Sequence, residues 1–213
     1  MQALIGKKVG MTQVFDDQGR HIPVTVIQAG PCIILQSKTA KADGYESVQL
    51  GFEDVKEQRS TKARVGHCKK AGVGPKRVLR EVRLDAGDQC KPGDPVGVSI
   101  FEGVEYVDVI GITKGRGFQG VVKRHRMQGG PMAHGSGFHH TGGSIGNRTW
   151  PGRVMKNKRM SGHMGHVKQT TQNLKVIQVR NDDNVLLVRG AVPGPTGGIL
   201  VVRKSVKRAA KKS

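Results

Sequence analysis

The stretch EYVDVIGITKGRGFQGVVKRHRMQGG, residues 105–130, contains the point at which this chain changes character. Up to Thr113 apolar residues alternate with polar ones, which predicts a β-strand over residues 105–113. From Lys114 onward glycine and basic residues dominate. Val121 and Val122 are the only branched aliphatic residues between Thr113 and Gly143. A segment of this composition is not expected to form a hydrophobic core of its own.

Short strands are predicted on both sides of this basic segment, and Gly, Pro or Asp residues bound those that precede it. They cover residues 23–28, 32–37, 46–52, 77–84, 94–101 and 105–113, and then 173–180, 184–192 and 198–206. Residues 181–183 form a polar link consistent with a hairpin, and one helix is predicted near 61–71. Many short strands at close spacing are typical of a small barrel or sandwich. The sequence therefore predicts a mainly β domain with a long excursion over residues 113–166.

The charge of the chain is unevenly distributed. The 213 residues carry a formal net charge of +20. Residues 1–108 hold 16 Lys/Arg and 14 Asp/Glu, whereas residues 109–181 hold 13 Lys/Arg and no acidic residue. A solvated basic face is the simplest explanation of such an excess. The complete absence of acids over this length instead favours contact with a polyanion.

Other bulk features narrow the class of protein. No apolar run approaches the roughly 20 residues that a membrane span needs, and the N-terminal residues lack the pattern of a signal peptide. We therefore expect a cytoplasmic protein without a membrane partner. Cys32, Cys68 and Cys90 are widely spaced and odd in number, which predicts reduced thiols.

Two glycine motifs suggest enzymes but lack the rest of the required pattern. Residues 115–120 match G-x-G-x-x-G, yet the residues that follow are poor helix formers, and the next acid is Asp182. Residues 142–146 match G-x-S-x-G, but a nucleophile elbow needs an acid and then a histidine later in the chain. The last histidine is His166, and no acid stands between it and the motif. We predict that the protein is not an enzyme and binds no small-molecule substrate.

The histidines of the basic segment raise the question of a metal site. His134, His139, His140, His163 and His166 stand in a region without Cys or carboxylate, whereas zinc sites favour Cys/His sets at fixed spacing. We predict no metal site and no cofactor. Any Mg²⁺ nearby would be bound by a nucleic acid and not by the protein. The N-x-T sequence at residues 147–149 has no meaning without secretion.

The composition instead meets the requirements for binding RNA. Basic side chains neutralise phosphates, glycines let backbone N–H groups approach them, and flat side chains stack on unpaired bases. Trp150 could be a core residue, but its neighbours show no apolar periodicity, so we expect it at an exposed tip. The predicted contacts are Lys7, Lys8, Lys114, Arg116, Phe118, Lys123, Arg124, His125, Arg126, His134, His139, His140, Arg148, Trp150, Arg153, Lys156, Lys158, Arg159 and His163.

Several segments together resemble a known family. They are LIGKKVGMTQVF, IPVTVIQAGPC, DGYESVQLGF and VLLVRGAVPGPTGG, together with the run Phe101, Asp108, Gly111, Thr113, Gly115-Arg116-Gly117, Gly120 and Arg124. This combination resembles the family of large-subunit ribosomal protein number three, in its bacterial or organellar form. The resemblance extends over nearly the whole chain.

The resemblance implies a fold. It is a translation-protein-type six-stranded β-barrel with an irregular α+β insertion and a long extended finger. The single domain would span 1–205, with the insertion at about 38–90, the finger at about 113–166 and a basic tail at 206–213.

It also implies a place and partners. The finger would thread through large-subunit (23S-type) rRNA and support the peptidyl transferase centre with a tip formed by Asn147, Arg148, Thr149, Trp150 and Pro151. The protein would bind early in assembly near the 3′ end of that RNA, beside ribosomal proteins fourteen and nineteen. It would lie in the ribosome, cytoplasmic or organellar. The alternative is a non-ribosomal RNA-binding protein or RNA chaperone, which charge alone does not exclude.

One departure from the family concerns the tip. Some bacterial members have a methylated glutamine shortly before a Pro-Gly pair. Here the corresponding stretch is GSIGNRTWPGRV, which contains no glutamine. We therefore predict that this modification is absent.

Overall fold

The computed structural model describes residues 1–84 and 90–208 and divides the chain into two compact units. The first comprises Met1–Ile112 together with the chain from Lys168 onward, and the second comprises Thr113–Val167. The expected basic tail lies outside the described residues from 209 onward, and residues 85–89 of the expected insertion do so as well. Among the described helices, none is long and apolar enough to cross a membrane.

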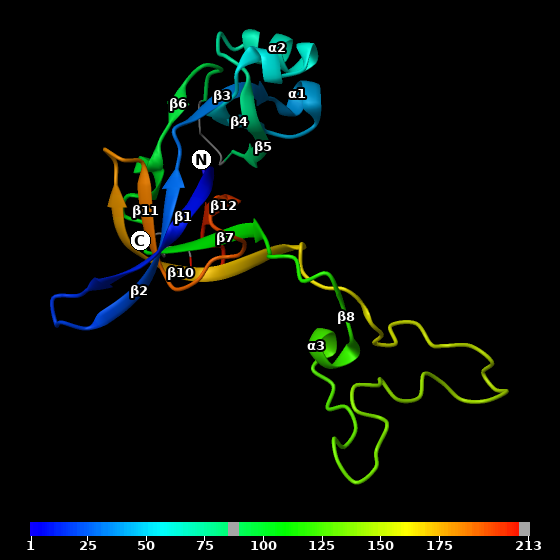
Figure 1. Cartoon of the computed structure of the whole chain (residues 1–213). Helices are drawn as coiled ribbons and strands as arrows, with labels where there is room; N and C mark the ends of the chain where they lie inside the picture. The colour runs from blue at the N-terminus through cyan, green and yellow to red at the C-terminus, as the bar shows by residue number, and fades with distance from the viewer. Residues whose placement is uncertain (85–89, 209–213) are drawn as a thin grey trace. The chain divides into compact units, whose positions relative to one another are not determined.

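A closed antiparallel barrel is the main element of the first unit (Figure 1). Its six strands are β1 (Ala3–Phe15), β2 (His21–Ala29), β7 (Tyr106–Ile112), β10 (Lys168–Arg180), β11 (Val185–Arg189) and β12 (Ile199–Lys204). They pair in the order β1-β12-β7-β10-β11-β2, and β2 closes onto β1. The predicted mainly β fold with a six-stranded barrel is confirmed.

The barrel core consists of branched aliphatic side chains contributed by nearly every strand. Fully buried examples are Leu4, Ile5, Ile27, Val107, Val109, Leu186, Val188, Leu200 and Val202. Space is tight where β7 meets β12, because a Cβ added to Gly111 would lie 2.6 Å from Leu200 Cδ2. Glycine at this position therefore permits the close packing of the two strands.

A second sheet in the same unit has the strand order β5-β4-β3-β6. These strands are β3 (Cys32–Lys38), β4 (Ser47–Asp54), β5 (Lys76–Arg83) and β6 (Pro95–Val96). Short helices accompany them: α1 (Ala40–Asp43), α2 (Lys62–Lys69) and the 3₁₀ turns η1 (Glu57–Arg59) and η2 (Val98–Phe101). The predicted helix near 61–71 is confirmed as α2, which begins after Thr61 because the Thr61 hydroxyl accepts a hydrogen bond from the Arg64 N–H.

Glu53 joins the barrel to this second sheet. Its carboxylate accepts hydrogen bonds from Lys7 Nζ of β1 at 2.7 Å and from Arg77 Nη1 of β5 at 2.9 Å. The bond from Lys7 is the main reason that the pKa of Glu53 is held below its ordinary value, and Arg77 contributes further. A lowered carboxyl pKa stabilises the fold above the ordinary carboxyl pKa, and this contribution is lost as pH falls through the lowered value.

Three predictions about strands need correction. Residues 94–101 were expected to form one strand, but only Pro95–Val96 pairs, and Val98–Phe101 turns as a 3₁₀ helix. This turn places Val98 and Phe101 on one face, where both are buried. Strand β1 was not predicted, because Gly6, Lys7 and Lys8 interrupt its apolar alternation. Strand β10 begins at Lys168, five residues before the predicted start at 173.

The thiols of the first unit are consistent with the prediction of reduced cysteines. Cys32 and Cys68 are buried and form no disulfide. Burial raises the pKa of Cys32 to about 11. The Cys32 thiol donates a hydrogen bond to the Ile5 carbonyl. Cys32 is therefore protonated and unreactive at neutral pH.

Asp108 connects three barrel strands at one point. It is almost fully buried on β7, and its Oδ1 accepts the backbone N–H of Asn173 at 3.0 Å, where β10 shifts register. Its Oδ2 lies 3.1 Å from Arg203 Nη2, on the directly opposed residue of β12. A buried carboxylate is stable only with such partners, so Asp108 and Arg203 hold β10, β7 and β12 together.

We expect Asp108→Ala to lower the free energy of unfolding by about 3 kcal/mol, because it leaves a backbone N–H and a half-buried guanidinium without their acceptor. Urea denaturation at fixed salt measures this loss. Asp183→Ala, which changes an exposed acid between β10 and β11, is the matched control and should be neutral. Equal effects of the two substitutions would contradict the role assigned to Asp108.

Candidate nucleic-acid interface

The second unit, residues 113–167, is here called the basic arm, and it begins as a narrow antiparallel ladder. The Thr113 N–H donates to the Val167 carbonyl at 3.0 Å, and the Arg116 N–H donates to the Met164 carbonyl at 2.9 Å. The ladder continues into a pair of two-residue strands, β8 (Phe118–Gln119) and β9 (Gly162–His163). Backbone hydrogen bonds, and not a hydrophobic core, therefore define the base of the arm.

Beyond the ladder the arm forms one short helix and two long loops (Figure 1). Helix α3 spans Val121–His125, and the first loop closes where the Gly130 N–H donates to the His139 carbonyl at 3.1 Å. The second loop contains a small turn in which the Ser144 hydroxyl donates to the Gly146 carbonyl at 2.9 Å. The Ser144 hydroxyl, which also accepts the Gly146 N–H, thus belongs to a local turn.

Helix α3 corrects one expectation. The residues after the G-x-G-x-x-G motif were predicted to be poor helix formers, yet a single helical turn follows Gly120. Val121 is 7% exposed and packs against Gly142. A Cβ added to Gly142 would lie 3.2 Å from Val121 Cγ2. A small local contact is thus enough to fix one turn of helix. The absence of an acid before Asp182 still argues against a dinucleotide site.

Several glycines of the arm serve contacts within the arm. A Cβ at Gly165 would collide with the Lys114 carbonyl, and one at Gly130 would collide with the Phe138 carbonyl. Gly165 also has a φ of +79°, in the left-handed region that favours glycine. The sequence pattern indicated that glycines let the backbone approach phosphates, whereas this packing role appears only in the paired backbone segments.

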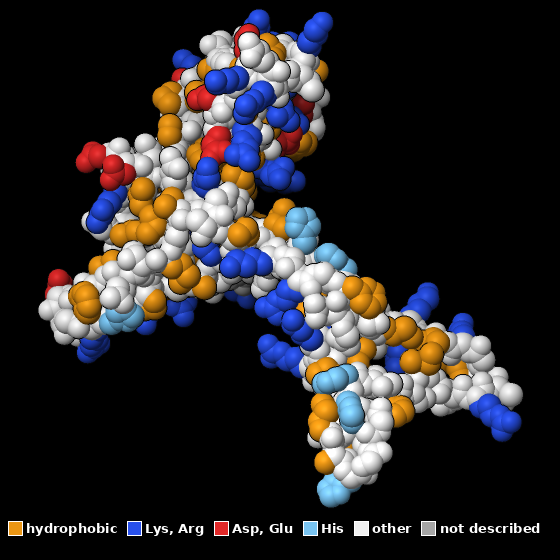
Figure 2. All heavy atoms as spheres, in the orientation of Figure 1, with side chains coloured by type: hydrophobic (Ala, Val, Ile, Leu, Met, Phe, Trp, Pro, Cys, Tyr) orange, Lys and Arg blue, Asp and Glu red, His pale blue; other side chains and the backbone are white. Residues whose placement is uncertain are grey.

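The basic side chains of the arm project outward and have no carboxylate of the arm as a partner. No Asp or Glu occurs between residues 109 and 181. One face of the arm in Figure 2 accordingly shows Lys, Arg and His side chains without acidic ones. The exposed basic residues are Lys114, Arg116, Lys123, Arg126, Arg148, Arg153, Lys156, Lys158 and Arg159. These charges repel one another unless an anion lies among them.

Arg124 and His125 are positioned differently from the other predicted contacts. Arg124 Nη1 donates to the Met160 carbonyl at 2.7 Å, and His125 Nε2 lies 3.0 Å from the same oxygen. A Cβ on Gly162 would lie 2.7 Å from Arg124 Nη1, so the guanidinium also covers β9. Both side chains are half-buried. Arg124 therefore ties α3 to the returning strand, a role that the sequence pattern did not indicate.

The aromatic rings and the other histidines of the arm are exposed. Trp150 is 84% exposed and Phe118 is 75% exposed, which confirms the expectation that Trp150 lies outside the core. His134, His139, His140 and His163 are exposed as well. Among the residues that the structure describes, no group of three or more His, Cys, Asp or Glu could hold a metal ion. The rings are therefore available for stacking.

The two predicted contacts on β1, Lys7 and Lys8, lie in the first unit, and the ammonium group of each has a hydrogen-bond acceptor within that unit. Lys8 is buried, and its Nζ donates to the carbonyls of Val192 and Gly194, both at 3.2 Å. Lys7 is half-exposed and paired with Glu53. Because its ammonium group is buried against these two carbonyls, Lys8 is not part of the proposed RNA interface.

Comparison with known proteins gives the family. Residues 88–185 match the family model described as Ribosomal protein L3. The chain is 50% identical over 206 residues to the large ribosomal subunit protein uL3 of Geobacter metallireducens, covering 97% of this chain and 98% of that protein. It is 48% identical to the uL3 of Heliobacterium modesticaldum, with the same coverage.

The chain belongs to the ribosomal protein L3 family. The predicted resemblance, in its bacterial form, is confirmed. Members of this family are generally structural and not enzymatic. As a ribosomal protein L3 of bacterial type, the protein is a structural constituent of the large ribosomal subunit in the cytoplasm.

We expect Arg124→Ala to loosen the base of the basic arm, whereas Lys123→Ala should not. Both substitutions remove one positive charge from α3, but of these two side chains it is Arg124 that donates to the Met160 carbonyl. Hydrogen exchange at the Arg116 and Met164 amides should accelerate about tenfold in Arg124→Ala, as the loss of one charged hydrogen bond implies. Identical exchange in the two variants would show that Arg124 has no positioning role.

Proposed function

We propose that the basic arm binds large-subunit rRNA and is the main RNA-binding element of the protein. The observation behind this proposal is a unit of 55 residues without a single carboxylate, so that its exposed cations have no acidic partner within the arm. Phosphates would relieve the mutual repulsion of these cations and release their own counterions. The half-exposed Lys7 and the exposed basic residues of the arm are the proposed phosphate contacts.

The arm fits irregular RNA better than a regular duplex. Trp150, Phe118 and Phe138 expose their rings on an arm whose backbone is mostly extended or looped. Such rings stack on bases that are unpaired, as in loops and bulges, and the groove of A-form RNA does not offer these. We infer that the second loop, with Asn147–Pro151 at its tip, inserts among such bases.

The family likeness supports a more specific placement. We propose that the tip lies near the peptidyl transferase centre, that the protein binds early in assembly near the 3′ end of the rRNA, and that ribosomal proteins fourteen and nineteen are its neighbours. In this proposal the protein positions RNA and takes no part in catalysis. A non-ribosomal RNA chaperone would share the electrostatics of the arm, but family membership favours the ribosomal role.

The tip sequence carries a consequence for modification. No glutamine occurs between Ser144 and Val154. We therefore propose that the glutamine methylation of some relatives is absent from this tip.

Replacing residues 113–167 by Asn-Gly should remove most RNA affinity and leave the barrel folded. Ile112 and Lys168 are paired across β7 and β10, so a two-residue hairpin turn can join them. About ten phosphate contacts predict a log–log salt slope on the order of −7 to −9 for the intact protein, and the replacement should abolish most of it. Binding to purified large-subunit rRNA over a salt series measures the slope.

A matched pair of triple variants controls for charge alone in this experiment. Lys156, Lys158 and Arg159 changed to Ala should flatten the slope by about 2 to 3, whereas Lys62, Lys69 and Lys70 changed to Ala should leave it unchanged. Both sets are exposed. An unchanged slope after removal of the arm would assign RNA binding to the barrel surface and overturn the proposal.

Trp150→Ala should weaken rRNA binding by about 1 to 3 kcal/mol, because one stacked base loses its platform. Trp150→Phe, which keeps a flat ring, should recover most of the affinity. Chemical probing should show one or a few bases exposed in the Ala variant and protected in the Phe variant. The stacking role is wrong if Trp150→Ala leaves affinity, base protection, subunit assembly and peptidyl transfer unchanged.

A further inference from the structure

The β1–β2 hairpin extends beyond the barrel as a two-stranded ribbon. Strand β12 pairs with β1 only over Ala3–Lys7, and Lys8 adds two backbone bonds to the turn at Gly197–Gly198. Strand β2 continues to pair with β1 as far as Phe15, opposite His21. Among the described strands, none pairs with the outer edge of β1 over residues 9–15. This edge is roughly 20 Å long.

The register of the ribbon shows which backbone groups face outward. The Asp16 N–H donates to the Arg20 carbonyl, so residues 16 and 20 form a hydrogen-bonded pair. Because such pairs alternate in antiparallel ribbons, Thr12 and Val14 bond to β2, whereas Met11, Gln13 and Phe15 turn their N–H and C=O groups toward the open edge. Those groups are a template for one more strand.

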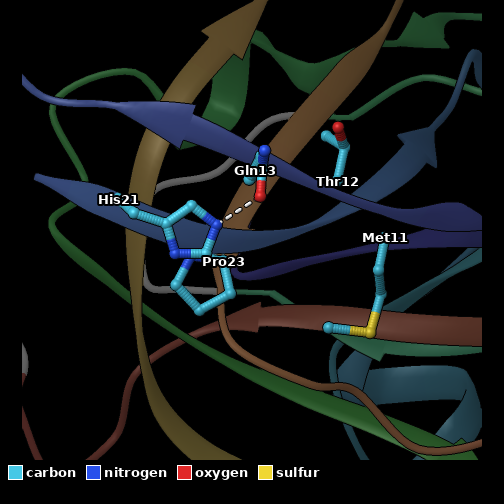
Figure 3. Close-up of a pocket in the computed structure, with 5 residues that line it drawn as sticks. All are labelled: Met11, Thr12, Gln13, His21 and Pro23. Carbon is cyan, nitrogen blue, oxygen red and sulfur yellow. Dashed lines mark hydrogen bonds between the residues drawn. The ribbon is translucent and has the colours of Figure 1, made fainter.

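The same ribbon exposes an apolar face beside that edge. Met11 and Phe15 are 52% and 63% exposed. Phe15 packs edge-on against His21 with ring centroids 6.0 Å apart, and the His21 ring is hydrogen-bonded to the Gln13 amide oxygen. A shallow cavity of about 360 Å³ lies among Met11, Thr12, Gln13, His21 and Pro23 (Figure 3). It is open to solvent, so a side chain of an adjacent strand can enter it between Met11 and Pro23.

The charge of the ribbon distinguishes between occupants. Residues 9–23 contain Asp16 and Asp17 against the single Arg20, so this is a slightly acidic region in a chain of net charge +20. RNA is disfavoured, because phosphates meet two carboxylates and cannot donate to the outward C=O groups. A second copy is disfavoured, because two chains of charge +20 repel each other. The carboxylates of Asp16 and Asp17 instead complement, at close range, a segment of another protein that carries Lys or Arg.

We propose that the open edge of β1 over residues 9–15 binds an extended segment of another, basic protein, which adds one strand to the ribbon. The backbone of that segment pairs with Met11, Gln13 and Phe15, one of its apolar side chains lies in the depression beside Met11, and a flanking Lys or Arg faces Asp17. This site is separate from the basic arm, so the protein would use one protruding element for RNA and another for a protein.

Photocrosslinking in intact large subunits tests the proposal. The full-length chain carries p-benzoylphenylalanine in place of Phe15, is assembled in cells, and the subunits are irradiated. We expect a cross-link to one peptide of a different protein, with an apolar residue next to Lys or Arg, identified by mass spectrometry. The same probe in place of Phe118 on the arm should instead cross-link to rRNA, which keeps failure of the two proposals distinguishable.

Edge variants, made in the chain that carries the probe at position 15, test the mode of binding. Gln13→Pro removes one outward N–H and should lower the yield of the cross-link about tenfold. Gln18→Ala, at an exposed turn position outside residues 9–15, is the control and should preserve the yield. Asp17→Lys changes no backbone bond and should lower the yield of the cross-link, because lysine repels the basic segment. This variant keeps the test valid if proline at position 13 disturbs the fold of the ribbon. A cross-link to rRNA, a cross-link to a second copy or the absence of any cross-link would overturn the proposal. The proposal would also be wrong if neither Gln13→Pro nor Asp17→Lys changed the yield of the cross-link.

Discussion

The buried carboxylate of Asp108 is the interaction on which the closed barrel depends. It accepts the Asn173 N–H where β10 shifts register and pairs with Arg203 on β12, so one side chain fixes the relative positions of three strands. Strands β7 and β10 are also the strands that lead into and out of the basic arm. The same constraint therefore sets the register at which the arm leaves and re-enters the barrel.

The basic arm follows a different physical principle from the barrel. Its base is held by backbone hydrogen bonds, by the Arg124 guanidinium on the Met160 carbonyl and by glycines that let two chain segments approach closely. Few apolar side chains are buried in it, and Val121 is one of them. Such an element leaves its cations and rings facing outward, which suits a structural constituent of the large ribosomal subunit that is proposed to insert into RNA.

The β1–β2 ribbon shows a third way of using a surface. It exposes backbone groups, two apolar side chains and a slight acidic excess, whereas the arm exposes cations and rings. A polyanion and a basic polypeptide need opposite charges for binding. The separation of these charges along the chain therefore allows one small protein to hold both kinds of partner.

The sequence by itself determined the mainly β class, the family, the extent of the basic segment and the exposure of Trp150, because these follow from local alternation, motif spacing and the distribution of charge. It did not reveal strand β1, whose apolar alternation is broken by Lys7 and Lys8, or the 3₁₀ turn at Val98–Phe101. Only the tertiary structure decided that Lys8 and Arg124 bind carbonyl oxygens while neighbouring cations stay exposed. The physical reason is that a basic residue has the same local pattern whether it faces solvent or a backbone carbonyl distant in sequence, and only the folded chain brings that carbonyl within reach.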